Sequence, residues 1–284
     1  MAFLFFAFLK KICYNIFIKG DKTMKKNIYI CGDIHGSKLP IESFLSRNKE
    51  ASFSQTSTVI ILLGDAGANF YLNKTDKKFK KFLNTTPFTY FLIRGNHEER
   101  SSNLASANPD KWHEEIFFKN TVLVEDEYSN IKYALDMPAI YEIDGYKTLT
   151  IPGAYSVDKY FRLKSKWPWF KDEQLTIEEM NLGRKLLEEN NYNVDLVLSH
   201  TCPSIYEPTD LFLKNIDQSL VDNTMERYLG EIEFKLNYQV WLWGHFHNFR
   251  RYPIDKEGRQ RIMLSAGQEF LKLEDIFNKE YITY

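Results

Sequence analysis

Short runs of mostly apolar and β-branched residues recur along the chain, and each run ends in a tight polar segment. Five such runs occupy residues 28–31, 59–63, 88–93, 194–198 and 240–243. Apolar residues that follow one another without alternation are typical of strands covered on both faces. The pattern therefore predicts buried strands in a layered fold.

Helical periodicity separates several of these runs. It is clearest over residues 175–190, where apolar side chains stand at helical spacing among good helix formers. Weaker helical patterns cover residues 41–47, 77–83 and 220–234. An Asp-Gly pair at positions 144 and 145 predicts a β-hairpin between residues 139–143 and 147–151. We expect an α/β arrangement with mixed sheets, forming a single domain over residues 24–284.

The first residues of the chain do not follow this pattern. Residues 1–9 are apolar, but no positive charge precedes them, Lys10 and Lys11 follow them, and no cleavage site of small residues comes next. Nine apolar residues also fall short of the roughly 20 that span a bilayer. We expect residues 1–23 to be an extension outside the fold, with translation beginning at Met24, and we expect no membrane association.

Composition narrows the classes of protein further. A chain of 284 residues that is 44% hydrophobic can bury a sizeable core. The formal net charge of -1 provides no basic field that would hold nucleic acid stably. Three scattered cysteines suit neither a disulfide framework nor a thiolate zinc site, so we expect a cytoplasmic protein.

Polar residues that bind metals gather directly after the five predicted strands. Five of the six histidines of the chain lie there, together with two aspartates and one asparagine: Asp33, His35, Asp65, Asn96, His97, His200, His245 and His247. Loops at the carboxyl ends of strands converge in α/β folds, and the glycines that precede several of these residues permit close backbone approach. Imidazole, carboxylate and carboxamide ligands suit Mn, Fe, Zn or Co. The sequence therefore predicts one shared metal site.

The order of these motifs resembles the calcineurin-like metallophosphoesterase superfamily. Asp-x-His, Gly-Asp, Gly-Asn-His, a lone His and Gly-His-x-His follow one another from residue 33 to residue 247. The resemblance implies a four-layer αββα sandwich with two mixed β-sheets and two divalent metal ions. It implies that Asp33, His35 and His247 bind the first ion, that Asn96, His200 and His245 bind the second, and that Asp65 bridges them.

The same resemblance implies a hydrolase of phosphomonoesters or phosphodiesters. Paired ions activate water as a metal-bound hydroxide and clamp the phosphate oxygens. His97 corresponds to the histidine of the family that protonates the leaving alkoxide or holds the phosphate beside Asn96, and Asp33 is expected to assist it. A small phosphate ester is the expected substrate, with nucleotides left open.

Two alternatives to a small-ester hydrolase stay open. The run Gly95-Asn96-His97-Glu98 also resembles serine/threonine phosphoprotein phosphatases, but their Gly-Asp-x-Val-Asp-Arg-Gly motif is replaced here by Gly64 followed by Asp-Ala-Gly-Ala-Asn, without the arginine. The other alternative is a non-catalytic scaffold of the same fold, which intact ligand positions disfavour.

Four residues outside the ligand set invite interpretation. The basic and aromatic residues of the loop-like stretch 153–170 favour substrate contact, with Arg162 as the expected phosphate-binding residue. Glu98 and Arg94 either order the metal ligands or mark an ordinary helix start after a strand, and we favour the helix start. His113 is interpreted as an ordinary surface or helix residue.

Overall fold

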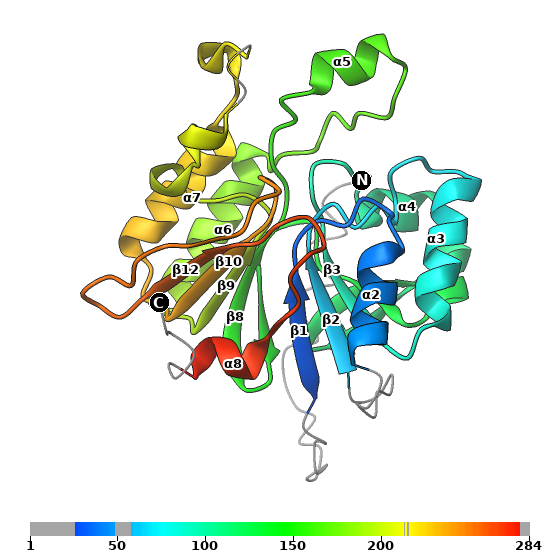
Figure 1. The fold of residues 1–284 in the computed structure, drawn as a ribbon, viewed down its shortest axis with the longest axis horizontal. Coiled ribbons are helices and arrows are strands. Elements are labelled where there is room, and N and C mark those ends of the chain that lie inside the picture. The colour runs from blue at the N-terminus through cyan, green and yellow to red at the C-terminus, as the bar shows by residue number, and fades with distance from the viewer. Residues whose placement is uncertain (1–25, 49–57, 213, 215, 279–284) are drawn as a thin grey trace.

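The computed structural model describes residues 26–48, 58–212, 214 and 216–278 (Figure 1). Two mixed β-sheets lie face to face in this part of the chain, and helices cover their outer faces. The extension predicted for residues 1–23 lies outside the described residues, as do the last six residues of the predicted domain. The four-layer α/β sandwich expected from the motifs is confirmed.

The first sheet has seven strands in the order β13-β1-β2-β3-β6-β5-β4. Their bounds are Leu271–Lys272, Asn27–Cys31, Thr58–Leu63, Thr89–Ile93, Ile131–Tyr133, Asn120–Glu125 and Trp112–Phe117. Strands β1, β2, β3 and β6 run parallel to one another, and β13, β5 and β4 pair antiparallel. The loops after β1, β2 and β3 therefore meet at one edge.

The second sheet has six strands in the order β11-β12-β10-β9-β8-β7. Their bounds are Arg250–Arg251, Gln260–Met263, Val240–Trp243, Leu196–Ser199, Tyr146–Ile151 and Ala139–Ile143. The four central strands are parallel, and β11 and β7 pair antiparallel at the two edges. The predicted hairpin is the β7–β8 pair.

Helices lie outside both sheets, as Figure 1 shows. On the first sheet these are α2 (Leu39–Arg47), α3 (Lys74–Thr85) and α4 (Ser101–Ala107), and on the second they are α6 (Ile177–Glu189) and α7 (Thr224–Lys235). The short helices α5 (Lys159–Lys164) and α8 (Leu273–Phe277) stand at opposite ends of the sandwich. Single 3₁₀ turns are η1 (Pro109–Lys111), η2 (Asp126–Tyr128), η3 (Ser204–Tyr206), η4 (Thr209–Leu211) and η5 (Gln218–Leu220).

The sequence of strand β2 does not alternate between apolar and polar residues, because both faces of the strand are buried. Val59, Ile61 and Leu63 belong to the core between the two sheets, whereas Ile60 and Leu62 pack beneath the helices of the first sheet. Both faces are dry, and every residue of the strand is buried. The prediction of strands covered on both faces is confirmed.

Most predicted elements are found within a few residues of their expected bounds. The helix predicted over residues 175–190 is α6, which begins after Thr176 with a reciprocal capping box to Glu179. The pattern over 220–234 is split between η5 and α7. The stretch 153–170 is not wholly a loop, because it contains α5. His113 is an exposed residue of β4, which the sequence analysis did not predict as a strand.

In the described segments, no helix combines the length and the apolar character that a membrane crossing requires.

Candidate metal centre

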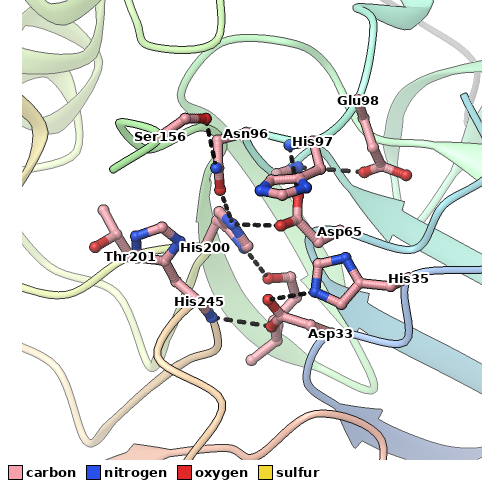
Figure 2. A network of polar contacts seen from close by, with 12 residues as sticks. Asp33, His35, Asp65, Asn96, His97, Glu98, Ser156, His200, Thr201 and His245 are labelled. Atoms are coloured by element: carbon pink, nitrogen blue, oxygen red, sulfur yellow. Dashed lines mark hydrogen bonds and ion pairs between the residues drawn. The ribbon is translucent and has the colours of Figure 1, made fainter. Parts of the chain in front are cut away.

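The predicted ligand residues meet where the loops from the two sheets face each other (Figure 2). Loops after β1, β2 and β3 carry Asp33, His35, Asp65, Asn96 and His97, and loops after β9 and β10 carry His200, His245 and His247. The structure brings all eight to one end of the sandwich, although up to 212 positions separate contacting members in sequence. The predicted assembly of one site from both sheets is therefore present.

Asp33 is the centre of one cluster. Its Oδ1 accepts a hydrogen bond of 2.9 Å from the backbone N–H of His245. Its Oδ2 lies 3.2 Å from His247 Nε2 and 3.9 Å from His35 Nε2, and these two ring nitrogens are 2.9 Å apart. The Oδ2 atom is buried, and the described residues give it no hydrogen bond. Three candidate ligand atoms thus point at one small volume.

Asp65 is the centre of a second cluster. Its Oδ1 accepts a 2.8 Å hydrogen bond from the backbone N–H of His97, and its Oδ2 lies 3.6 Å from His200 Nε2. His200 Nδ1 lies 2.7 Å from the carbonyl oxygen of Leu63 and donates to it. The other ring nitrogen of His200, Nε2, lies 2.8 Å from Asn96 Oδ1.

These contacts fit bound cations. Asn96 Nδ2 donates to Ser156 Oγ, so the Oδ1 atom that faces His200 is an acceptor. His200 Nε2, which faces this oxygen, also presents a lone pair when it carries no proton. Two lone pairs that face each other require a proton or a cation between them. Among the described residues, three sets lie with their ligand atoms within 4.8 Å of one another: Asp33, His35 and His247; His35, Asp65 and His97; Asp33, Asp65 and His200. Asp33 and Asp65 each belong to two of these sets, and together the sets are consistent with a dinuclear metal site.

Burial and neighbouring charges perturb several of these groups. Burial opposes ionisation of Asp33 and Asp65, but the surrounding histidines lower the pKa of each carboxyl below its usual value. Burial also opposes protonation of His200, yet the two carboxylates raise its pKa to about 9. Burial and the neighbouring His200 lower the pKa of His245 to about 3. Strong perturbation of this kind is concentrated at functional sites.

The backbone at the ligands is itself unusual. His35, Asp65, His245 and His247 have φ angles of 46°, 48°, 67° and 52°, in the left-handed region. Non-glycine residues adopt this region rarely, and such outliers cluster at ligand-binding sites. Gly64, which precedes Asp65, has a φ of 94°, and a Cβ there would lie 2.1 Å from His200 Nδ1. Gly95 permits close approach, since a Cβ there would lie 2.0 Å from Asp65 Oδ1.

Ser156, which the sequence analysis missed, supports the ligand Asn96. Ser156 Oγ accepts from Asn96 Nδ2 at 2.8 Å, donates to Glu173 Oε2, and accepts from Arg162 Nη2. Arg162 is 0% exposed, and it also bonds Asp158 Oδ1 and the carbonyl oxygen of Pro168. Serine has no distinctive sequence signal, and only its place in the stretch 153–170 pointed to this region.

Glu98 corrects one interpretation. Its carboxylate accepts hydrogen bonds from the backbone N–H groups of Gly67, Ala68 and Gly95 at 3.0–3.3 Å. It therefore ties the loop after β2 to the loop after β3 and does not cap a helix, so the helix-start interpretation is wrong for Glu98. Arg94 pairs with Asp136 at 3.1 Å and donates to Glu173 O at 2.8 Å, which braces the same loop.

Comparison with known proteins bears on the fold and the motifs. The model of the calcineurin-like phosphoesterase family matches residues 26–249, well over half of the chain. Comparison with curated proteins gives no match.

Similar solved structures share low sequence identity with this chain. The phosphopantetheinyl hydrolase of Mycobacterium tuberculosis is 12% identical, with a TM-score of 0.46 over 86% of this chain and 91% of that one. TT1561 of Thermus thermophilus is 12% identical, with a TM-score of 0.44 over 89% and 96% of the two chains. GAP50, described as the anchor in the inner membrane complex of Plasmodium, is 11% identical, with a TM-score of 0.43 over 86% and 72%.

Proposed function

This chain belongs to the calcineurin-like phosphoesterase family, and we propose that it is a hydrolase of small phosphate esters that works with two divalent metal ions. One observation carries the proposal: Asp33 and Asp65, from the first sheet, share a cluster of ligand atoms with His200 from the second sheet. Carboxylates and imidazoles that converge in this way are the ligands of Mn, Fe, Zn and Co.

We propose two metal positions formed by the residues of this chain. Asp33, His35 and His247 would hold one ion, Asn96, His200 and His245 would hold the other, and Asp65 would contact both. Two such ions, when bound, supply a water nucleophile at neutral pH and offset charge on the phosphate oxygens. The hydrogen bonds to Asp33 Oδ1 and Asp65 Oδ1 orient each carboxylate so that its Oδ2 faces the histidines.

His97 is the proposed proton donor to the leaving group. Its ring stacks on Phe70 with centroids 5.7 Å apart, and its Nε2 lies 3.9 Å from Asp158 Oδ1. Asp158 is therefore a second carboxylate, besides the predicted Asp33, that can hold the imidazolium in place. Asn96 and His97 are also proposed to contact the phosphate. The predicted substrate contact of Arg162 stays a prediction, and its buried guanidinium supports Ser156.

Metal removal and replacement test this function. Purified full-length protein is stripped with a chelator, and hydrolysis of 4-nitrophenyl esters is measured before and after Mn, Zn, Co or Fe is restored, with bound metal counted on the same sample. We expect activity only with metal, and close to two ions per chain. The His113→Ala variant is the matched control, because His113 is an exposed histidine outside the centre. Protein that carries two ions and hydrolyses no ester would contradict the proposal.

A further inference from the structure

Two cavities open from the candidate metal centre and share the side chains of His97 and Asp158. The first has a volume of about 530 Å³, and His35 also lines it. The second has a volume of about 900 Å³, and its lining includes Asp65, Asn96, His245 and His247. Ligand pockets of roughly 300–1,000 Å³ hold molecules of drug size. Each cavity is therefore large enough for an organic group of its own.

The first cavity is aromatic and basic. Phe70, Tyr71 and Trp167 contribute rings to its wall, and Lys38 and Lys78 contribute exposed amines. Asp76 also lies in this wall, but its carboxylate accepts hydrogen bonds from the backbone N–H groups of Tyr71 and Leu72. A flat ring, or a ring that carries an extra anionic group, is the chemistry that this wall complements.

The second cavity is apolar and acidic. Its lining includes the large apolar side chains of Leu211, Phe212, Val221 and Phe246. It also includes three carboxyl groups besides those it shares with the centre, namely Glu207, Asp222 and Glu226. Lys214 is the single lysine among the described residues of this wall. An anionic group is disfavoured beside the carboxylates of Asp158 and Asp222, whereas an uncharged organic group fits.

The centre itself offers little positive charge from side chains. Arg162 is the only arginine among the described residues that line either cavity. It is 0% exposed, and its guanidinium is already bonded to Asp158, Ser156 and Pro168. A phosphomonoester near neutral pH carries about one more negative charge than a diester. The exposed cations in the described parts of these walls are Lys38, Lys78 and Lys214, and none is a guanidinium that could bind the phosphate through two parallel hydrogen bonds.

From these observations we propose that the substrate is a phosphodiester with two unlike substituents. An aromatic or anionic group lies in the first cavity, whose wall includes Tyr71 and Trp167, and an uncharged, largely apolar group lies in the second. A monoester has one organic group and leaves one cavity empty. The inference rests on the proposed function and names the substrate class of that same site.

The reaction balances with water as the only co-substrate. A P–O bond to the water oxygen forms, one P–O ester bond breaks, and the leaving alkoxide takes up a proton. Of the two protons of the water molecule, one ends on the leaving alkoxide and the other is released to solvent near neutral pH. The products are one alcohol and one phosphomonoester, which keeps the other substituent and carries one more negative charge than the diester.

Two esters with the same leaving group test this proposal. The metal-loaded full chain is given 4-nitrophenyl phosphate and the 4-nitrophenyl ester of thymidine 5′-phosphate. We expect kcat/KM for the diester to exceed that for the monoester by about tenfold or more. Equal or better hydrolysis of the monoester overturns the diester proposal but leaves the proposed function standing. Hydrolysis of neither ester by chain that holds two ions overturns both.

Narrowing the second cavity tests whether a substituent of the diester occupies it. Leu211→Trp places a larger ring in its wall, and Ile116→Trp adds the same ring at an exposed position of β4. We expect Leu211→Trp to lower kcat/KM for the diester by about tenfold, and we expect Ile116→Trp to leave it unchanged. Hydrolysis of the diester by Leu211→Trp at the rate of the unsubstituted protein overturns the proposal.

A binding measurement that needs no catalysis examines the first cavity. Thymidine 5′-phosphate should quench the fluorescence of Trp167, which is 53% exposed in the wall. We expect this quenching in metal-free protein, and we expect it to disappear in Trp167→Phe and to weaken in Tyr71→Ala. Quenching that is identical in wild type and Trp167→Phe contradicts the placement of the ring.

Discussion

The candidate centre has a buried half and an exposed half, and the two are built differently. Asp33, Asp65 and His200 have side chains that are 1%, 2% and 0% exposed. His35, His97 and His247 are 34%, 24% and 48% exposed. In the buried half each side chain is fixed by a backbone hydrogen bond, whereas in the exposed half the described contacts are mostly with other histidines and with the aspartates.

This difference in burial indicates which residues act mainly in metal binding and which act mainly in turnover. Ligands that are locked by backbone groups keep their geometry without metal, since a change of rotamer would leave a buried polar group unpaired. The exposed histidines face the cavities, where substrate arrives. Changes in the buried half should therefore remove metal and destabilise the loops, and changes in the exposed half should act mainly on turnover.

The strongest test replaces the residue shared by both metal positions. Asp65→Asn keeps the shape of the side chain but removes the charge that faces His200. We expect hydrolysis to fall to background and bound metal to drop below two ions per chain, measured by elemental analysis. His247→Ala, in the exposed half, should retain more metal than Asp65→Asn. Equal metal loss in the two variants would contradict the proposal that the buried half acts mainly in metal binding and the exposed half mainly in turnover.

His97 is the next test, because it belongs to the exposed half and is not assigned a metal. We expect His97→Gln to lower kcat by roughly 10²–10⁴-fold while metal content stays unchanged. The loss should be larger for an alkyl ester than for a 4-nitrophenyl ester, since a good leaving group needs little protonation. Loss of bound metal in His97→Gln would instead assign His97 to the ligands, as its proximity to His35 and Asp65 allows.

Ser156→Ala probes the support behind Asn96. The substitution removes the acceptor of the Asn96 Nδ2 hydrogen bond, so the amide is free to turn its oxygen away from His200. We expect affinity for the second ion to weaken by about 10–100-fold, measured by competition with a chelating dye. Ser165→Ala, at an exposed position in the same segment, is the matched control. Unchanged affinity in Ser156→Ala would show that Asn96 needs no such support.

The smallest expected effect concerns pH and Glu226, which lines the second cavity. Burial, opposed by a hydrogen bond from Thr201, raises the pKa of Glu226 from 4.5 to about 7. The folded chain then holds a proton that the unfolded chain releases, so the contribution of Glu226 to stability is greatest below about pH 4.5 and is lost as pH rises through about 7. Chemical unfolding of metal-free protein at pH 5 and pH 8 should show this loss, and Glu226→Gln should reduce it. If the stability of Glu226→Gln changes between pH 5 and pH 8 as much as that of the unsubstituted protein, other groups cause the effect.

Some of this organisation was accessible from the sequence, and the reasons are physical. Continuous apolar strands such as Val240–Trp243 are recognisable because both faces must be dry. The exposed strand β4 is not, because residues such as His113 and Glu114 give it a polar composition. Metal-type residues are informative because histidines are few. Ser156 and Glu173 are ordinary residue types whose function comes only from what they touch, so no pattern marks them.

The ligands reach the centre from both sheets, and this has a consequence for biosynthesis. His35 and His247 lie 2.9 Å apart but are separated by 212 positions in the chain. A ribosome delivers the amino-terminal aspartates long before the carboxyl-terminal histidines, and the intervening loop must close before the two groups meet. Ion capture with the full donor set therefore belongs to the end of maturation, and a chain that is cut short before residue 247 lacks part of that set.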